Sequence, residues 1–228
     1  MKQAIILCSG GLDSVTLAHY IKNSRKYSKT KILFFNYGQK SLKMERHYSK
    51  RCANETDSSF FEVKLNSLSK ISTSSINTGK KVSVSKSLKD TKKESESWYV
   101  PSRNTIFISY ALSLAESDYI KNNIESDIFL GFKSEGKEAY PDTTEEYVNK
   151  INSLSKTSCI RNFKILAPFI KKDKEDIIKI ANKMGLDLRK TYSCYVGDKK
   201  QCGSCLACRL RKAGFYWAGI EDTSNYKS

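Results

Sequence analysis

Five short apolar runs alternate with stretches of helical spacing, and this alternation constrains the fold of the chain more than any other feature. The runs cover residues 4–8, 31–35, 60–63, 127–132 and 163–166. Runs of this length that are rich in Ile, Val and Phe are typical of buried strands. Because strands that alternate with helices pair in parallel, the sequence predicts an α/β, Rossmann-like parallel sheet with helices on both faces.

Helices are expected between the runs, at residues 14–22, 39–53, 105–117, 141–156 and 174–184. Ser102 is the expected cap of the third of these helices, Asp173 caps the last, and Gly185 ends it. Residues 66–97 fit no such element, because Ser, Thr and Lys dominate them. We expect a long, partly mobile excursion there.

The length and charge of the chain limit the kinds of protein that it can be. A chain of 228 residues suits one large domain, alone or with a small appendage. No apolar run reaches the ~18 to 20 residues of a membrane span, and the N-terminal run is too short for a signal peptide, so we expect a soluble cytoplasmic protein. The formal net charge is +16, from 40 Lys and Arg against 24 Asp and Glu. Because the basic residues are scattered, a solvated surface is favoured over a nucleic-acid interface, although this charge would attract phosphorylated ligands such as ATP.

The hexapeptide SGGLDS, which begins at Ser9, lies between the first expected strand and the helix that follows. Gly10 and Gly11 allow backbone N–H groups to approach an anion, while the Ser9 and Ser14 hydroxyls and the helix N-terminus supply further donors. The segment has neither the Walker A nor the GxGxxG pattern. Asp13 could cap the helix or help to hold Mg²⁺ across phosphates. The sequence therefore predicts a phosphate-binding loop.

Four of the seven cysteines crowd into the C-terminal region, at Cys194, Cys202, Cys205 and Cys208. An odd number of cysteines in a cytoplasmic chain argues against a disulfide framework. Zn²⁺ prefers four tetrahedral thiolates, and a closed set of four leaves no open position, so we expect one structural zinc per chain. Free thiols, a redox CxxC pair and an iron–sulfur cluster are the alternatives. The remaining cysteines lie in or beside expected elements and are interpreted as buried residues: Cys8, Cys52 and Cys159.

Placed directly after the first strand, SGGLDS resembles the pyrophosphate-binding loop of the PP-loop ATP pyrophosphatases, which cleave ATP between the α and β phosphates. Further tracts follow in order: Tyr37-Gly38-Gln39, VPSRN from residue 100, Tyr140-Pro141-Asp142, and SCY and CGSCLAC around the four cysteines. Together they resemble the QueC family of 7-cyano-7-deazaguanine synthases, from residue 4 to about residue 215.

This resemblance implies a PP-loop ATP-binding α/β domain over residues 1–191 and a zinc-binding region over residues 192–228. It implies conversion of 7-carboxy-7-deazaguanine, ammonia and ATP into the nitrile preQ0, on the route to queuosine or archaeosine in tRNA. Mg²⁺ as a cofactor and a homodimer are also expected, with nucleic-acid and membrane partners disfavoured. His19 and His47 have no partner motif and are not expected to be catalytic.

The resemblance also assigns site residues by position. The ATP-binding residues are Cys8, Ser9, Gly10, Gly11, Leu12, Asp13, Ser14, Val15, Tyr37 and Gln39. The substrate-binding residues are Arg103, Asn104, Tyr140 and Asp142, the catalytic residues are Asp13, Ser14 and Arg103, and the zinc ligands are the four clustered cysteines. By its chemistry, Asp142 could accept the N–H groups of a guanine-like edge or cap the helix after Pro141.

One tract departs from the family pattern. The common form reads GVxxxDxSGYPDCR, whereas residues 131–144 read GFKSEGKEAYPDTT. This loss leaves two alternatives, the same substrate or a QueC-like enzyme that activates a deazaguanine for another acceptor, such as a protein amine. A PP-loop tRNA thiolase or lysidine-type ligase and a nucleic-acid-binding module are further alternatives, which the salt dependence of tRNA binding would separate.

Overall fold

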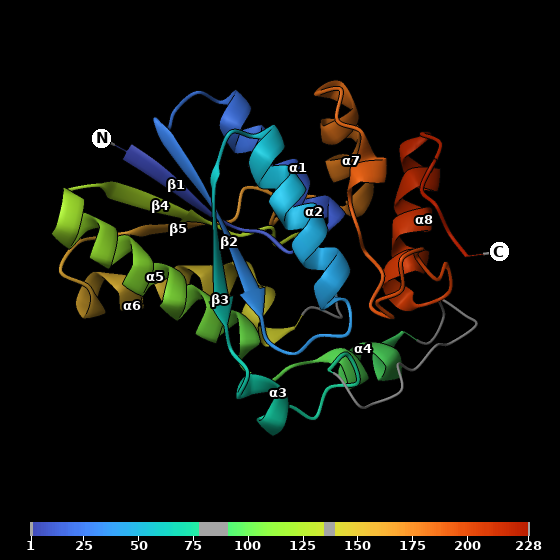
Figure 1. Ribbon diagram of the computed structural model, residues 1–228, viewed down its shortest axis with the longest axis horizontal. Helices are drawn as coiled ribbons and strands as arrows, with labels where there is room; N and C mark the ends of the chain where they lie inside the picture. The colour runs from blue at the N-terminus through green and yellow to red at the C-terminus, as the bar shows by residue number, and fades with distance from the viewer. Residues whose placement is uncertain (1, 78–90, 135–139, 228) are drawn as a thin grey trace.

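The computed structural model describes residues 2–77, 91–134 and 140–227, and five strands form one fully parallel sheet among them (Figure 1). The spatial order is β3-β2-β1-β4-β5. The strands are β1 (Lys2–Leu7), β2 (Lys29–Asn36), β3 (Ser59–Lys64), β4 (Glu125–Phe129) and β5 (Lys164–Leu166). The predicted parallel α/β fold is confirmed, and all five predicted strands are present.

Strand β1 lies in the centre of the sheet and pairs on both sides. Ile6 is opposite Ile32 of β2 and opposite Phe129 of β4. Helices cover both faces here, so the side chains of residues 3–6 in β1 are buried whichever way they point. A continuous apolar run, without polar alternation, is the pattern that such a strand requires.

Helices pack on both faces of the sheet (Figure 1). On one face the apolar cluster includes residues of α1 (Leu12–Asn23), α2 (Leu42–Glu55), α7 (Lys174–Lys183) and α8 (Leu206–Ala218). A second cluster includes residues of α5 (Arg103–Asn122) and α6 (Glu145–Ser158) and continues into the four-cysteine region. The division at residue 191 stays a prediction, but the two parts share this second cluster. No helix of the described residues has the length and apolar character to cross a membrane.

The excursion between β3 and α5 contains two short helices, α3 (Leu68–Ile71) and α4 (Lys92–Trp98). Trp98 at the end of α4 is buried in the second apolar cluster. Residues 78–90, which belong to the predicted mobile part, lie outside the described residues, as do residues 135–139 of the altered tract. Leu68 of α3 is buried in the same cluster, so the described parts of the excursion are anchored to the domain at both ends.

Several sequence-based boundaries are wrong. The helix expected over residues 39–53 begins at Leu42, and the helix expected over residues 105–117 runs from Arg103 to Asn122. The helix predicted from residue 141 begins at residue 145, because Pro141–Thr143 forms a separate 3-10 turn and Thr144 caps α6 by accepting the backbone N–H of Tyr147. Strand β4 ends at Phe129, not at residue 132. Asp173 is the N-cap of α7, as predicted, and forms a capping box with Asp176, while Gly185 follows the end of the helix with φ +68°.

Ser102 was predicted to cap α5, but its side chain makes no capping bond. The residue has a left-handed backbone with φ +53°. The carboxylate of Asp142, far along the chain, accepts the backbone N–H of Asn104 instead. A long-range contact therefore replaces the local cap.

Gly10 is the position at which the loop after β1 tolerates no side chain. Its φ is +75°, and a Cβ built there would lie 2.8 Å from the carbonyl oxygen of Glu45 and 2.9 Å from the backbone nitrogen of Ser49. Backbone atoms of a packed helix cannot move aside as a flexible side chain can. The loop and α2 are in direct contact because residue 10 is glycine.

We predict that Gly10→Ala lowers the free energy of unfolding by about 2 to 4 kcal/mol, since left-handed strain and a backbone clash add together. Gly185→Ala is the matched control, because Gly185 has φ +68° with open space around it and should lose only about 1 kcal/mol. Urea denaturation of both variants measures the difference. If both variants lost the same free energy of unfolding, the contact between residue 10 and α2 would not contribute to stability.

Candidate functional site

Two loops meet at the carboxyl end of the sheet, where the strand order places the first and fourth strands side by side. The chain leaves β1 toward β2 and leaves β4 toward β5, so the two loops diverge and a crevice lies between them. The loop from Ser9 follows β1, and Gly131 follows β4. A Cβ on Gly131 would lie 3.3 Å from the backbone nitrogen of Ser14, so the second loop packs against the start of α1.

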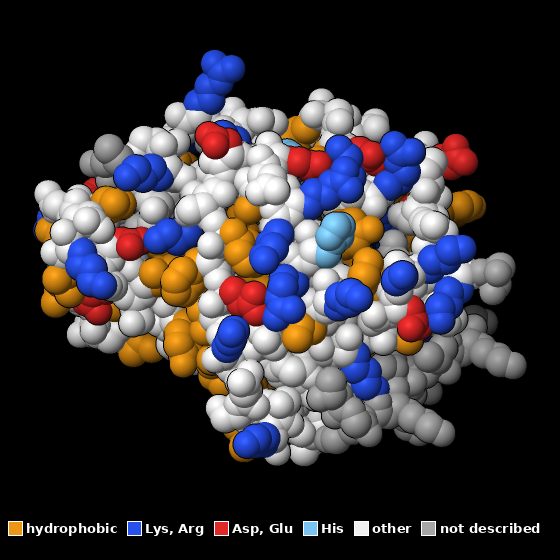
Figure 2. All heavy atoms as spheres, in the orientation of Figure 1, with side chains coloured by type: hydrophobic (Ala, Val, Ile, Leu, Met, Phe, Trp, Pro, Cys, Tyr) orange, Lys and Arg blue, Asp and Glu red, His pale blue; other side chains and the backbone are white. Residues whose placement is uncertain are grey.

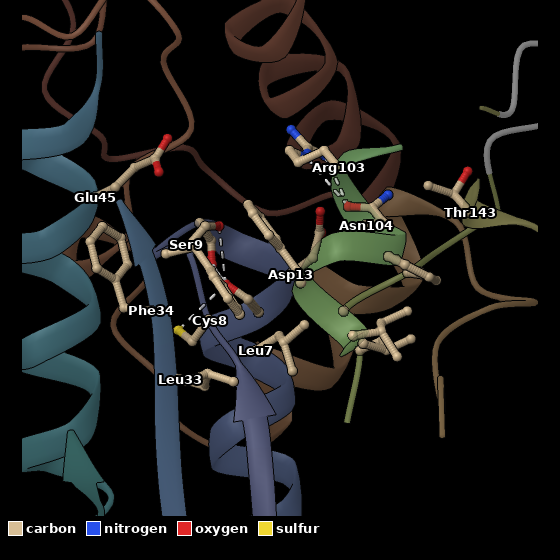
Figure 3. A pocket seen from close by; sticks show the side chains of 18 of the residues that line it. Leu7, Cys8, Ser9, Asp13, Leu33, Phe34, Glu45, Arg103, Asn104 and Thr143 are labelled. Atoms are coloured by element: carbon tan, nitrogen blue, oxygen red, sulfur yellow. Dashed lines mark hydrogen bonds between the residues drawn. The ribbon is translucent and has the colours of Figure 1, made fainter. Parts of the chain in front are cut away.

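A cavity of about 270 Å³ fills this crevice, and we call it the inner cavity. Its apolar wall comes from the strand ends and α5, with Leu7, Leu33, Phe34, Phe35, Ile108 and Leu130. Its polar wall comes from the SGGLDS loop and the start of α5 (Figure 3). The combination of a flat apolar wall and convergent polar groups suits a planar ligand that carries charged groups.

A second space of about 460 Å³, the outer cavity, extends toward α7 and the four-cysteine region. The two cavities share a group of lining residues, which we call the junction: Ser9, Gly11, Asp13, Glu45, Lys133, Tyr140 and Tyr195. The two cavities are therefore two parts of one site that meet beside the loop after β1.

The start of α1 carries an ion pair. Lys174 Nζ lies 2.5 and 2.8 Å from the two carboxylate oxygens of Asp13. Asp13 does not cap α1, because the N-cap is Gly11 and makes no side-chain bond. Ser14 Oγ donates to the carbonyl of Gly11 at 3.1 Å, inside the same turn. Helix α1 thus presents its N-terminus and a lysine from α7 to the same space.

Most of the predicted ATP and substrate residues line the cavities. The inner cavity is lined by Cys8, Ser9, Gly11, Asp13, Ser14, Tyr37, Arg103, Asn104 and Tyr140, and Leu12 lines the outer one. Four predicted residues line neither cavity: Gly10, Val15, Gln39 and Asp142. Gly10 packs on α2, and Val15 lies in the apolar core. Cys8 and Cys52 are buried as predicted, whereas Cys159 is partly exposed.

Gln39 is buried and holds the segment between β2 and α2 together. Its side-chain oxygen accepts the backbone N–H of Tyr37 at 2.9 Å, and its nitrogen donates to the carbonyl of Phe35 at 2.9 Å and to Glu45 Oε2 at 3.0 Å. Every polar atom of the amide is therefore occupied within the protein. Of the Tyr37-Gly38-Gln39 tract, Tyr37 lines the inner cavity and Gln39 does not, whereas Glu45, which Gln39 holds, does line it.

Arg103 brings a positive charge to the inner cavity from the start of α5. Its guanidinium carbon is 5.8 Å from the ring centre of Tyr37, and two of its nitrogens donate to Asn104 Oδ1 at 3.3 Å. Burial raises the pKa of Tyr37 to about 12, although Arg103 opposes the shift, so the phenol stays protonated near neutral pH. A guanidinium stays charged under these conditions and can bind a carboxylate through two parallel hydrogen bonds.

Asp142 belongs to the site through Asn104. Its Oδ2 accepts the backbone N–H of Asn104 at 3.2 Å, and its carbonyl accepts Asn104 Nδ2 at 3.3 Å. The residue lines a narrow pocket beside Arg103 and Tyr140. It caps α5 and not the helix after Pro141, and it thereby holds the VPSRN tract in position.

The four cysteine sulfurs form a candidate metal centre, since all of them lie within 4.8 Å of one another. A tetrahedral zinc–thiolate site has sulfur–sulfur separations of about 3.8 Å, and Cys202 Sγ and Cys208 Sγ are 3.9 Å apart. The backbone N–H groups of Val196 and Cys202 donate to Cys194 Sγ at 3.4 and 3.3 Å. Donors of this kind stabilise thiolate ligands, so the residues present fit a bound metal.

The four-cysteine region also contributes to the wall of the site. Tyr195, directly after Cys194, lies at the junction and packs edge-on against Trp98 of α4, with ring centres 4.9 Å apart. Glu94 of α4 accepts the backbone N–H of Leu206 at 2.9 Å and pairs with Arg209. The metal centre and the excursion before α5 are thus joined beside the cavities.

Some lining residues were missed by sequence reasoning, namely Glu45, Lys133, Lys174 and Tyr195. Tyr195 stood in the quoted SCY tract, and Lys174 follows the correctly predicted cap Asp173. Glu45 carried no signal beyond its place in a polar helix. Neither His19 nor His47 is among the residues that line the two cavities.

The fold and the loop define the class of the protein. A parallel sheet with β1 in its centre, followed by SGGLDS at the N-terminus of α1, is the nucleotide-binding arrangement of the PP-loop ATP pyrophosphatases. The sequence model of one family, described as "Queuosine biosynthesis protein QueC", matches residues 3–219. The chain belongs to the QueC family.

Curated relatives agree with this assignment over their full length. The chain is 36% identical to the 7-cyano-7-deazaguanine synthase of Methanosphaera stadtmanae, over 99% of this chain and 98% of that protein. It is 34% identical to the enzyme of the same name from Campylobacter jejuni subsp. jejuni, over 100% and 99%. Among solved structures, the U34-tRNA thiolase NcsA from Methanococcus maripaludis matches with a TM-score of 0.47 and 14% identity, over 97% of this chain and 74% of that one.

We predict that Asp142→Ala lowers the free energy of unfolding by about 1 to 3 kcal/mol, because the buried N–H of Asn104 loses its acceptor at the start of α5. Asp142→Asn keeps an acceptor oxygen, so its free energy of unfolding should fall clearly less. Thermal unfolding of the two variants side by side is the measurement. If the two variants were equally stable, the cap would not be the role of this side chain.

Proposed function

We propose that this chain is a 7-cyano-7-deazaguanine synthase, which uses ATP and ammonia to convert 7-carboxy-7-deazaguanine into the nitrile. The observation that carries the proposal is the family match over residues 3–219 in a chain whose PP-loop opens into a cavity. The relatives of this name are matched over nearly their whole length. The reaction class is therefore ATP-dependent C–N ligation followed by dehydration of an amide.

The inner cavity supports the binding of ATP at the strand ends. We assign the adenine ring to the apolar wall and the phosphates to the loop from Ser9 to Ser14, where backbone N–H groups and the helix N-terminus attract anions. Lys133 and Lys174 line the outer cavity beside this loop and suit the departing pyrophosphate. The carboxylate of Asp13 is a hard oxygen donor of the kind that Mg²⁺ prefers. Bound Mg²⁺ would neutralise phosphate charge there.

Arg103, Asn104 and Tyr140 line the opposite part of the inner cavity, and we assign them to the deazaguanine. The guanidinium of Arg103 would hold the carboxylate of the substrate in line with the α-phosphate. Asp142 positions Asn104, and its direct contact with the guanine-like edge stays a prediction. Residues 135–139 of the altered tract lie outside the described residues, whereas Thr143 of the same tract lines the inner cavity.

The chemistry needs positioning and charge more than covalent catalysis. Transfer of AMP to a carboxylate oxygen turns a poor electrophile into a good one, and ammonia then displaces AMP to give the amide. A second ATP activates the amide oxygen, and its departure with AMP leaves the nitrile. The chain supplies a fixed geometry, donors for the phosphates and a cation for the carboxylate, which are the terms that dominate such transfers.

We assign one structural Zn²⁺ to the four cysteines. Four thiolates complete a tetrahedral shell and leave no position for a substrate. The ion would hold Tyr195 and α8 in place beside the cavities, and no reaction step passes through it. An iron–sulfur cluster is the alternative, and metal analysis distinguishes the two by the iron content of the protein.

Partners other than small molecules have less support. Figure 2 shows Lys and Arg side chains spread over one face among Asp and Glu, without a continuous basic stripe. A tRNA-modifying ligase or a nucleic-acid-binding module needs a basic track along the phosphates, and this face gives no support to either. A homodimer and a cytoplasmic location remain expectations. A protein amine as the acceptor is the remaining alternative to ammonia.

We expect wild-type protein with ATP, ammonium and 7-carboxy-7-deazaguanine to form first the amide and then the nitrile. Mass spectrometry measures both products over time. Asp13→Ala should stop pyrophosphate release while the far-ultraviolet circular dichroism stays unchanged, because only contacts to the nucleotide and to Lys174 are lost. If wild type released pyrophosphate but formed no amide, another acceptor would be indicated. Normal turnover by Asp13→Ala would contradict the loop assignment.

We expect one zinc per chain in wild type, with less metal and a lower Tm in Cys205→Ser, since metal binding is coupled to folding. Cys159→Ser is the matched control, because Cys159 is a partly exposed thiol outside the cluster. Plasma emission spectrometry gives the metal content, and calorimetry gives the Tm. A coloured protein that contains iron would overturn the zinc assignment.

A further inference from the structure

Glu45 is a buried carboxylate for which the reaction outlined above has no use. The residue lies in the first turn of α2 and is 8% exposed. Its two oxygens accept hydrogen bonds from neutral donors, Ser41 Oγ and Gln39 Nε2. None of the ion pairs found among the described residues includes it. Arg103 attracts this charge from across the inner cavity, but it forms neither a hydrogen bond nor an ion pair with Glu45 among the contacts found in the described residues. A buried carboxylate that is contacted only by neutral donors is stabilised further when a cation binds directly beside it.

Glu45 lies where a nitrogen substrate that comes from the outer cavity would meet the inner cavity. It lies at the junction of the inner and outer cavities. Figure 3 shows Glu45 on α2 at one side of the inner cavity, with Arg103 and Asn104 of α5 across from it and the SGGLDS loop between them. The backbone of Glu45 also packs directly against Gly10 of this loop. Its carboxylate is therefore held beside the place where the acyl adenylate would form.

The other carboxylate at the junction cannot serve in the same way. Both oxygens of Asp13 are paired with Lys174. Asp173 and Glu175, which line the outer cavity, do not reach the junction. Tyr140 and Tyr195 lie at the junction as well, and aromatic rings with hydroxyl groups are favourable neighbours for a small cation. The local chemistry is thus that of a site for a small cation with N–H donors.

We propose that Glu45 binds ammonium at the junction of the two cavities and accepts its proton, so that neutral ammonia meets the acyl adenylate. This inference rests on the proposed function and adds the site of the nitrogen substrate. Gln39 and Ser41 fix the carboxylate in position. Burial raises the pKa of Glu45 despite these hydrogen bonds, which makes the carboxylate a better proton acceptor.

The step balances as follows. One proton passes from ammonium to Glu45, which leaves ammonia and a neutral carboxylic acid. The nitrogen lone pair forms the C–N bond to the acyl carbon, the C–O bond to AMP breaks, and AMP leaves with that electron pair. The nitrogen gives a second proton to water and becomes the amide nitrogen. Glu45 returns its own proton to solvent before the next turnover.

Glu45→Gln tests the proposal without removing the network. The new carbonyl can accept from Gln39 and the new amide can donate to Ser41 Oγ, since a hydroxyl both donates and accepts. With ATP, 7-carboxy-7-deazaguanine and ammonium we expect amide formation to fall about 100-fold. Pyrophosphate release without ammonium, which reports the adenylation step, should change by less than about 3-fold, since the contribution of a general base belongs to the later step.

Hydroxylamine supplies the decisive comparison, because at neutral pH it is mostly uncharged and needs no deprotonation before attack. Glu45→Gln should therefore form the hydroxamate at nearly the wild-type rate. Glu55→Gln, in the same helix but not among the residues that line the cavities, is the matched control and should use ammonium normally.

Two results would overturn the ammonium site. Normal use of ammonium by Glu45→Gln would remove the need for this carboxylate. Equal losses with ammonium and hydroxylamine would show that Glu45 positions the nucleotide or the deazaguanine. Failure of the proposed function would look different, because wild type itself would then give no amide and no hydroxamate.

Discussion

The close contact between the loop after β1 and the elements around it is the constraint on which the rest of the site depends. Gly10 lets the loop touch the backbone of α2, and its carbonyl accepts the backbone N–H of Tyr192 at 2.9 Å. Ser49 of α2 donates to the carbonyl of Cys8 at 2.9 Å, and Gly131 packs on the start of α1. One short turn therefore sets the relative positions of α2, the loop after β4 and the four-cysteine region. Any residue larger than glycine at position 10 would separate them.

The four-cysteine region forms a wall of the site and is also a candidate metal centre. Arg211 of α8 is fully buried and donates to Thr191, Ser193 and the carbonyl of Leu188, which ties the helix to the segment that leads into the cysteines. Tyr195 then reaches the junction of the two cavities. A metal ion at a chain end can in this way affect a reaction that it does not take part in, because it holds the side chains beside it in one arrangement.

Charge in the site is divided between its two sides. Lys133 and Lys174 lie beside the loop that suits phosphates, and Arg103 lies where a substrate carboxylate would be held. Glu45 provides negative charge between them. The overall net charge of +16 accounts for none of this, because it does not specify where the charged residues lie. What matters for the chemistry is which few charges are buried next to the two cavities.

The sequence by itself determined the parallel α/β fold, the phosphate-binding loop and the cysteine cluster, since each depends on residues close together in the chain. Apolar runs, a glycine pair and thiols a few residues apart can be read directly because local spacing sets their geometry. Tertiary structure alone decided that Asp142 caps α5 in place of Ser102 and that Glu45 reaches the cavity. Tertiary structure likewise decided that the amide of Gln39 makes its hydrogen bonds to other groups of the protein. It also decided that Lys174 pairs with Asp13 across 161 positions. These roles follow from which elements the sheet order and the core bring together, and no local pattern carries that information.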